Sequence, residues 1–469
     1  MSRAVAGAQA SESENAHLSF WHATCAGPAR VTPSLAEDID VDVAIVGAGF
    51  TGLWTAYYLK SLDPSLSVCV LEANFPGFGA SGRNGGWAVG EMAGMATRFA
   101  DPTLRDSAIR LQRALFDAVS EIGRVSEKEN IDCHYAKGGT INVATSPAFE
   151  KQLQAEAEHW ASLGFGEADF RWLPAEESSR VVRTRENLGG LFSPHCAAIH
   201  PQRLVSGLVT SVERMGVRIY SDTPATSIEA GRVSTPGGTV KAGMVVGATE
   251  AYTDSIAGRK RRILPFHSMM IATEPLSEAI WHEIGLNERE TFGDPRRMVI
   301  YGQRTLDGRL AFGARGGYFF GSAIHSRFSP TDVAFEHVRQ CLENLFPVLS
   351  SVEVTHCWGG ALGIPRNWRP VVGIDRGARF SWAGGYVGEG VAATNLAGQT
   401  LADLILETDS PLVDLAWVGP AFKRWEPEPL RWLGVAGLGF LGERLDAIDL
   451  AGRTSPRLLN WLHDWMIKK

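Results

Sequence analysis

The chain has 469 residues, of which 45% are hydrophobic and 21% charged, so it can bury a large core and divide into two lobes. Its 52 acidic and 45 basic residues give a net charge of -7, which argues against binding to nucleic acid or to an anionic membrane. No apolar run reaches the length of about 18 residues that spans a bilayer.

The cysteines and the N-terminal residues indicate the cellular compartment of the protein. The six cysteines form no CxxC pair and no metal-ligand spacing. We therefore expect a reducing cytoplasm, no disulfide framework and no metal site. Residues 1–17 are small and polar and lack the apolar stretch of a secretory signal, so we expect them to be disordered and not to direct export.

The segment 41–72 is typical of a strand, a glycine-rich turn, a helix and a second strand that together hold a dinucleotide. Gly47 permits the tight turn, Gly49 lets phosphate approach the backbone, and Gly52 lets helix and strand pack closely. Amides at the helix start face the phosphate charge. Glu72, twenty residues beyond Gly52, is placed to accept ribose hydroxyls. The predicted cradle comprises Gly47, Gly49, Phe50, Thr51, Gly52, Glu72 and Ala73.

A second glycine-rich run, residues 74–87, indicates which dinucleotide binds. A nicotinamide cofactor needs no second backbone cradle, whereas the ribityl chain and ring of FAD extend onward and must be approached by main chain. The run also carries hydroxyl, amide and guanidinium groups, although a simple flexible loop remains the alternative. The candidate FAD contacts here are Ser81, Arg83, Asn84, Gly85 and Gly86.

Further along the chain, apolar periodicity predicts helices over 104–127, 150–162 and 201–215 and a strand over 137–144. The segments 217–220, 225–228 and 244–248 are predicted to be further strands of the cofactor domain. Period-two and apolar patterns at 269–272, 298–301 and 310–313 predict an antiparallel sheet in a substrate lobe.

A third glycine-rich turn follows a strand near residue 380. Residues 392–406 then form a predicted helix, whose N-terminus would stabilise negative charge on a reduced flavin ring. Another GxGxxG match at 437–442 lacks a preceding strand and is followed by only 27 residues, so we interpret it as coincidental. The candidate contacts of the third turn are Gly385, Gly388, Glu389, Gly390 and Val391.

The motifs GAGFTG with Glu72, GASGRNGG at 79–86, His200-Pro201, 270–276 and GGYVGEGV followed by NLAG resemble the FAD-dependent D-amino-acid oxidase superfamily. Within it, the lead-in 19–21 and the tail 424–433 are most similar to the gamma-glutamylputrescine oxidoreductases and related bacterial amine oxidoreductases. The resemblance covers about residues 19–433 and also places Ala225 beside the adenosine.

The resemblance implies an α/β fold with a discontinuous Rossmann-like FAD-binding domain and an α+β substrate lobe built on an antiparallel sheet. We expect an N-terminal extension over 1–36 and a C-terminal helical extension over 411–469. Between them, FAD-binding segments are expected at 37–100, 196–262 and 351–410, and substrate-lobe segments at 101–195 and 263–350.

Three residues are catalytic candidates. His267 lies just ahead of the strand that the resemblance places beside the ring, and Arg315 could anchor a carboxylate through two hydrogen bonds. Trp358 could form a wall of the cavity. The alternatives are a histidine satisfied in the core, a solvated arginine at a strand end and a core tryptophan.

We therefore expect an FAD enzyme that oxidises the C–N bond of an amine or amino acid by hydride transfer to flavin N5, giving an imine that hydrolyses. The GRNGGW run has no histidine and residues 305–309 have no cysteine, so the FAD is expected to be non-covalent. Oxygen, giving hydrogen peroxide, or another acceptor would reoxidise it. The alternatives are a dehydrogenase of a 2-hydroxy acid or other C–O substrate and a non-enzymatic flavin-binding protein.

Overall fold

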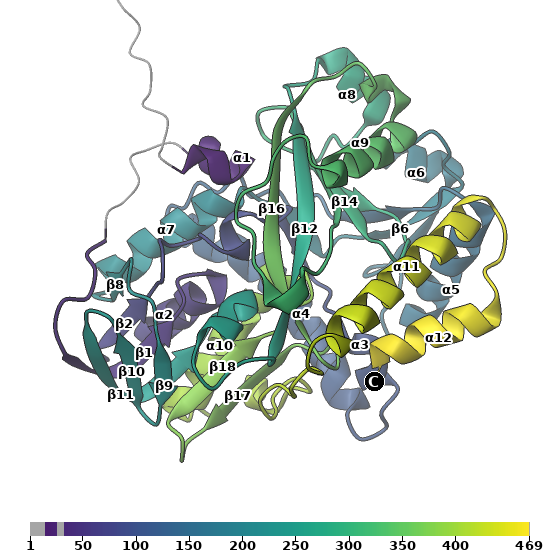
Figure 1. Ribbon diagram of the computed structural model, residues 1–469. Helices are drawn as coiled ribbons and strands as arrows, with labels where there is room; N and C mark the ends of the chain where they lie inside the picture. Colours follow the sequence, from purple (N-terminus) through teal and green to yellow (C-terminus); the bar gives the residue numbers. More distant parts are fainter. Residues whose placement is uncertain (1–14, 26–31, 469) are drawn as a thin grey trace, which may run out of the picture.

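The computed structural model describes residues 15–25 and 32–468, so the disorder expected for residues 1–17 falls mostly outside the described residues. Two sheets of eight strands each organise these residues (Figure 1), and two further strands form a small separate sheet. The predicted division into a parallel-sheet part and an antiparallel-sheet part corresponds to these two large sheets.

The first sheet has a parallel centre. Its strands follow the order β17-β18-β11-β1-β2-β8, with β10 beside β11 and β9 beside β10. Val43 of β1 pairs with Val68 of β2 and with Met244 of β11, all in parallel. Bounds are β1 Ile39–Val46, β2 Val68–Leu71, β8 Arg218–Tyr220, β9 Ser227–Glu229, β10 Arg232–Thr235, β11 Gly238–Gly247, β17 Val371–Asp375 and β18 Phe380–Gly384.

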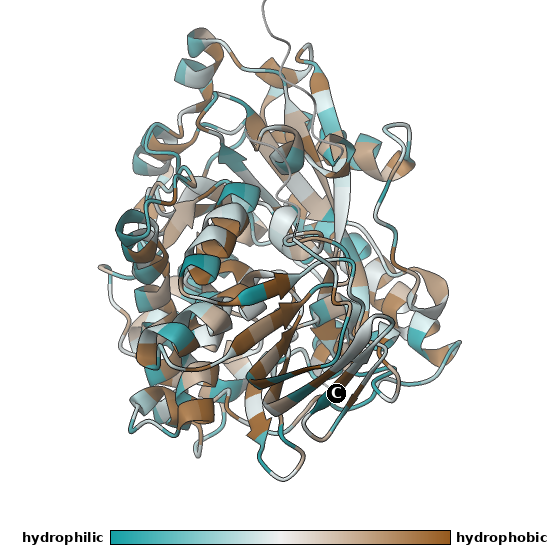
Figure 2. Cartoon of the chain, turned by 90° about the vertical axis from the view of Figure 1, so that its left-hand side faces the viewer, coloured by the Kyte–Doolittle hydropathy of each residue, from teal (hydrophilic) through white to brown (hydrophobic). Residues whose placement is uncertain are grey.

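Burial on both faces explains the near-continuous apolar sequence of this sheet. All four residues of β2 are buried, and the strands facing the viewer in Figure 2 carry mostly hydrophobic colour. Helix α2 (Phe50–Leu62) packs against both α7 (Pro201–Arg214) and α10 (Gly390–Leu406). The glycine turn between β1 and α2 is thus held in the middle of the sheet.

The second sheet has the order β16-β12-β15-β14-β13-β4-β6-β5. Its pairs are antiparallel except β13 with β4, which is parallel. Helix α9 (Val333–Leu345) covers β12 and β15. Bounds are β4 Thr140–Val143, β5 Arg171–Pro174, β6 Gly189–Ser193, β12 Ile263–Thr273, β13 Thr291–Gly293, β14 Ile300–Arg304, β15 Leu310–Arg315 and β16 Val354–Pro365.

The remaining elements lie between and around the sheets. Strands β3 (Trp87–Val89) and β7 (Cys196–Ala198) form the small sheet. The other helices are α1 Phe20–Ala23, α3 Met95–Phe99, α4 Arg105–Lys128, α5 Pro147–Ser162, α6 Ala175–Val181, α8 Glu278–Ile284, α11 Leu430–Leu450 and α12 Arg457–Lys468.

The predicted helices over 104–127, 150–162, 201–215 and 392–406 correspond to α4, α5, α7 and α10. One domain boundary needs correction. Strand β16 lies in the 351–410 segment expected in the FAD-binding domain, but it pairs with β12 of the second sheet. The apolar pattern of β16 does not reveal its partner, because pairing depends on the long strand β12 beside it.

The apolar part of the C-terminal helix α11 is partly exposed. Within the stretch 430–441, Leu430, Leu433 and Phe440 lie open to solvent. The buried residues of α11 include Asp446 and Asp449, so the helix is attached by its charged residues. In Figure 1, α11 and α12 (yellow) lie beside α5. The second GxGxxG match lies within α11 and forms no nucleotide turn.

The cysteines of the described part of the chain are all free, and within residues 15–25 and 32–468 no cluster of histidine, cysteine and acidic residues could hold a metal. Among the helices described, none is long and apolar enough to cross a membrane.

Candidate active site

A cavity of about 510 Å³ is lined by residues of both large sheets. At one end it borders the glycine turn after β1, and it continues past the second glycine loop to β12, β14 and β15 of the second sheet. Fifteen of the eighteen candidate FAD contacts line it: Gly47, Gly49, Phe50, Thr51, Glu72, Ala73, Ser81, Arg83, Asn84, Gly85, Ala225, Gly388, Glu389, Gly390 and Val391.

The first glycine turn has the geometry that the sequence predicts. Gly47 has a φ of 110°, which favours glycine, and a Cβ at Gly52 would collide with the carbonyl oxygen of Gly47. Gly49 caps α2, and a Cβ there would lie 2.9 Å from Ser81 Oγ, on the side of the cavity. Gly52 supports helix–strand packing and does not itself line the cavity.

Glu72 directly follows β2, lines the cavity and is fixed by main-chain donors. Its carboxylate accepts hydrogen bonds from the amides of Ala48 at 2.8 Å and Asn74 at 3.0 Å. Burial raises its pKa, and these amide donors act in the opposite direction. The carboxyl group is therefore held in one orientation beside the start of α2.

The polar side chains of the second glycine loop hold the loop and connect it to neighbouring segments. Arg83 donates to the carbonyls of Phe78 at 2.8 Å and Ser326 at 2.7 Å, while Asn84 donates to the carbonyls of Ala80 and Ser81. Asn84 also accepts from the amide of Gly86, which does not line the cavity. The main chain thus remains available to a ligand.

The third glycine turn is organised by an acid that sequence reasoning missed. Glu250 accepts hydrogen bonds from the amides of Gly385 at 3.0 Å and Tyr386 at 3.1 Å, and burial raises its pKa to about 7. Gly385, whose φ is 74°, therefore shapes the turn without lining the cavity. Sequence analysis could have found Glu250, because it lies just after the predicted strand that became β11. Ligands bind in such sheets at the carboxyl ends of the strands.

Among the catalytic candidates, Arg315 lines the cavity at the end of β15. Its guanidinium stacks over the ring of Trp368 at 5.5 Å and has no hydrogen bond or ion pair to the residues described. Nearby, the hydroxyls of Ser268 and Tyr301 are 2.7 Å apart, and burial raises the pKa of Tyr301 to about 12. This end of the cavity therefore offers one cation and two neutral hydroxyls.

The structure does not bring His267 and Trp358 to the cavity. His267 alternates with Ser268 along β12 and faces the other way, where its Nε2 accepts from the amide of His325 at 3.1 Å. Trp358 is a core residue packed with Phe20 and Trp21, and its indole donates to the Arg83 carbonyl at 2.9 Å. Both placements correct the expectation that these side chains face substrate.

Besides Glu72, Glu250 and Asp294, three more acidic residues line this cavity: Glu91 after β3, Glu156 on α5 and Glu389 before α10. Sequence analysis assigned none of these three to the substrate end. Glu389 was expected only as an FAD contact. Burial and the charges of Glu156 and Glu389 raise the pKa of Glu91 to about 8, and burial raises that of Glu389 to about 7. No spacing in the sequence links these three segments.

Comparison with known proteins identifies the family to which this geometry belongs. The model of the family described as FAD dependent oxidoreductase matches residues 42–404. The chain belongs to the FAD-dependent oxidoreductase family. The match spans the glycine turns and both sheets.

Individual relatives in or near this family extend the comparison. The gamma-glutamylputrescine oxidoreductase of Escherichia coli is 30% identical over 395 residues, covering 83% of this chain and 89% of that protein. A probable oxidoreductase OrdL of Haemophilus influenzae is 29% identical, covering 81% and 86%. The crystal structure of glycine oxidase from Geobacillus kaustophilus superposes with a TM-score of 0.65 at 20% identity, covering 79% of this chain and 96% of that chain, and shares the fold.

As an FAD-dependent oxidoreductase, the chain should offer an elongated site for FAD, and the residues present fit that requirement. The glycines of the first turn leave the main chain open, and Glu72 borders the same cavity. The third turn leads into α10, whose first residues also line it. The cavity thus joins the three glycine-rich turns that an FAD molecule would contact.

Proposed function

We propose that this FAD-dependent oxidoreductase oxidises the C–N bond of an amine or amino acid. The observation that carries the proposal is Arg315, whose guanidinium forms no hydrogen bond or ion pair with the described residues, in the cavity that also borders the glycine turns. The names of the relatives, gamma-glutamylputrescine oxidoreductase and glycine oxidase, support the same class of substrate.

We assign FAD to the first sheet, held by the main chain of the three glycine-rich turns. Glu72 would accept the ribose hydroxyls, and the start of α2 would face the pyrophosphate. Gly388 and Gly390, at the start of α10, would lie beside the ring. The same assignment puts Ala225 at the adenosine end.

When bound, FAD supplies a ring that accepts a hydride from the carbon next to the amine nitrogen. Arg315 would bind a substrate carboxylate through two charge-assisted hydrogen bonds. The Ser268 and Tyr301 hydroxyls would orient polar atoms of the substrate. The substrate loses one hydride and one proton to become an imine, and water then gives a carbonyl compound and an amine.

The experiment is anaerobic bleaching of the bound flavin against a panel of polyamines, gamma-glutamyl amines, N-methyl amino acids, D-amino acids and 2-hydroxy acids. Bleaching by nitrogen compounds, faster as pH rises through the ammonium pKa of the substrate, is the expected result. Bleaching by hydroxy acids alone would establish the C–O dehydrogenase instead, and no bleaching by any compound would leave a flavin-binding protein.

Two further properties complete the proposal. The FAD is non-covalent, so acid precipitation should release all yellow colour from the protein. Oxygen or another acceptor reoxidises it, and hydrogen peroxide formation measured beside dye reduction separates an oxidase from a dehydrogenase.

A further inference from the structure

The second glycine loop is held from outside the cavity by a row of side-chain donors. Four consecutive carbonyl groups, those of residues 82–85, each accept a hydrogen bond from a side chain. The bonds run from Ser19 Oγ to Gly82 at 2.9 Å, from Trp358 Nε1 to Arg83 at 2.9 Å, from Trp21 Nε1 to Asn84 at 2.7 Å and from Gln303 Nε2 to Gly85 at 2.7 Å. The four donor residues do not line the cavity, so these carbonyls face away from it.

Two of the donors precede the part of the chain that matches the family. The family model begins at residue 42, well after Ser19 and Trp21. These two side chains are nevertheless core residues, with exposed fractions of 3% and 1%. A few residues on, Thr24 Oγ1 lies 3.1 Å from Nε2 of His200, the residue that caps α7. The lead-in is thus built into the FAD-binding part of the protein.

The direction of each carbonyl fixes the direction of the next amide. The peptide between Asn84 and Gly85 is trans, which puts its C=O and N–H groups on opposite sides. The bond from Trp21 to the Asn84 carbonyl therefore turns the Gly85 amide the other way. Gly85 lines the cavity, and its amide forms no hydrogen bond with the residues described. One main-chain donor is thus left for a ligand of the cavity.

The same loop supports the first glycine turn. Ser81 Oγ accepts a hydrogen bond from the amide of Phe50 at 2.8 Å, and Phe50 is the first residue of α2. A displaced second loop would therefore also disturb the turn that is assigned to the pyrophosphate.

We propose that Ser19 and Trp21 are positioning residues for the FAD. They hold the second glycine loop in the shape that presents its main chain to the cofactor, and they do not line the cavity themselves. The inference rests on the proposed placement of FAD along the three glycine-rich turns. If a donor is removed, the loop spends part of its time in other shapes, and the affinity for FAD falls by the fraction of binding-competent protein that is lost.

Trp21→Phe removes the indole donor and retains an aromatic ring. The apparent Kd of FAD, measured by flavin fluorescence on serial dilution of the holoenzyme, should rise about 2- to 10-fold, the effect of one hydrogen bond. Ser19→Ala should raise this Kd by a similar factor, and Ser19→Thr, which retains a hydroxyl, should restore most of the affinity. At saturating FAD, the visible circular dichroism of the bound flavin should also change in Trp21→Phe.

Trp281→Phe is the matched control. The Trp281 indole donates to the carbonyl of Gly308 at 3.1 Å, and its side chain is also 1% exposed, but it does not line the cavity or contact the second glycine loop. This variant should lower the melting temperature as much as Trp21→Phe, because each loses one buried indole donor. The Kd of FAD and the circular dichroism of the flavin should stay unchanged.

The outcomes separate this inference from the proposed function. An unchanged Kd of FAD in both Trp21→Phe and Ser19→Ala would overturn the positioning role and leave the placement of FAD intact. An equal loss of affinity in Trp281→Phe would also overturn it, since general destabilisation would then explain the effect. Failure of the unaltered protein to retain FAD would overturn the cofactor placement and this inference together, whereas failure of every amine to bleach the flavin would overturn only the proposed reaction.

Discussion

Single glycines fix the backbone on which the proposed FAD site depends. Gly52 has no room for a methyl group because the carbonyl oxygen of Gly47 occupies that position. Gly439, in the other GxGxxG match, lies within α11, and a Cβ added there would meet no described atom within 4 Å. Gly52 is the third glycine of its match and Gly439 the second, and at Gly442, the third glycine of the other match, a Cβ would meet its nearest atom only at 3.6 Å. The surrounding packing thus makes the two matches differ in tolerance.

Gly52→Ala should lower the free energy of unfolding by about 1–3 kcal/mol through overpacking and should also lower the FAD content. Gly439→Ala is its control and should raise stability by up to about 1 kcal/mol, because alanine favours an exposed helix. Thermal melts and the flavin-to-protein absorbance ratio measure both effects. Similar destabilisation by the two changes would contradict this account.

Arg315→Met should weaken binding of carboxylate-bearing substrates by about 10 to 100-fold, because it removes charge-assisted hydrogen bonds worth about 1.5–3 kcal/mol. For amines without a carboxylate, the fold-loss in affinity should be at least about tenfold smaller than for the carboxylate-bearing substrates. The measurement is the apparent Kd from flavin bleaching for an amino acid and for its decarboxylated analogue. A uniform loss for both compounds would remove Arg315 from carboxylate recognition.

Glu91 gives the substrate-free enzyme a predictable pH dependence. Its pKa of about 8 exceeds the ordinary value of 4.5, so the unfolded chain loses this proton first and stability falls as pH rises between these values. Glu91→Gln should therefore stabilise more at pH 8 than at pH 5.

At pH 8, Glu91→Gln should raise the free energy of unfolding by about 1 kcal/mol or more. This value is discounted for solvent screening, because Glu91 is partly exposed to the cavity. The buried His22 and His200, whose pKa values burial lowers to about 3, affect both proteins equally. Melting temperatures of the two proteins from pH 5 to pH 8 provide the measurement. A difference that stays constant across this range would be the contrary result.

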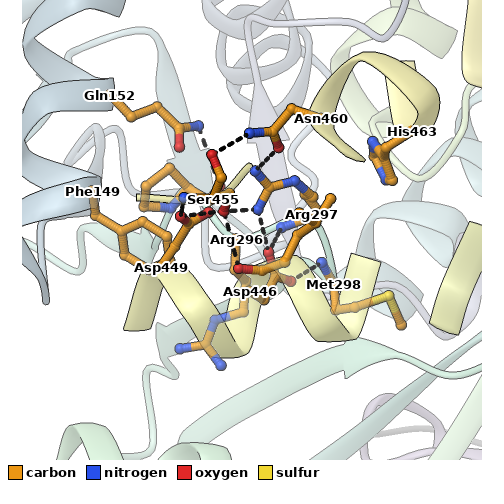
Figure 3. A network of polar contacts seen from close by, with 12 residues as sticks. Phe149, Gln152, Arg296, Arg297, Met298, Asp446, Asp449, Ser455, Asn460 and His463 are labelled. Atoms are coloured by element: carbon orange, nitrogen blue, oxygen red, sulfur yellow. Dashed lines mark hydrogen bonds and ion pairs between the residues drawn. The ribbon is translucent and has the colours of Figure 1, made fainter. Parts of the chain in front are cut away.

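At the scale of elements, a network of polar contacts with Arg297 and Met298 helps to attach α11 and α12 (Figure 3). Arg297 donates to Asp446 at 2.9 Å, to Asp449 at 2.8 Å and to Asn460 at 2.7 Å. The amide of Met298 also donates to Asp446, at 2.8 Å. Since Asp294 and Arg296, just before Arg297, line the cavity, these contacts link the C-terminal helices to its wall.

Asp446→Asn should destabilise the attachment of α11 and α12 by about 1.5–3 kcal/mol, because it weakens the charge-assisted hydrogen bonds from Arg297 and from the Met298 amide while Asp449 still pairs with Arg297. Hydrogen exchange in these two helices should accelerate while exchange in α2 stays unchanged. Asp464→Asn provides the control, since its carboxylate is exposed and its ion-pair partner is the neighbouring His463. Unchanged protection in the Asp446 variant would show that other contacts hold the helices.

At the scale of the whole molecule, the cavity lies where the two sheets meet and is lined by both. A ligand that fills it contacts strand ends of the first sheet and strand faces of the second. Binding therefore adds contacts across the boundary between the two parts of the chain.

FAD should stabilise the folded protein by mass action, by about 2.7 kcal/mol at a free concentration 100 times its Kd. Titration of the FAD-free protein should raise its melting temperature progressively. FMN, which lacks the adenosine end that we assign to Glu72, is the matched ligand and should give a smaller shift at equal concentration. Equal shifts from FAD and FMN would contradict the assignment of Glu72 to the adenosine-linked ribose.

The sequence by itself determined the first turn, the type of its flanking elements and the approximate bounds of α4, α5, α7 and α10, because these depend on local spacing and periodicity. Only the tertiary structure decided that β16 joins the second sheet, that His267 points away from the cavity, and that Glu250 holds the third turn. It alone also brought Glu91, Glu156 and Glu389 together. Contacts between residues far apart in the chain leave no local pattern, since burial and charge at a site are fixed by every element that surrounds it.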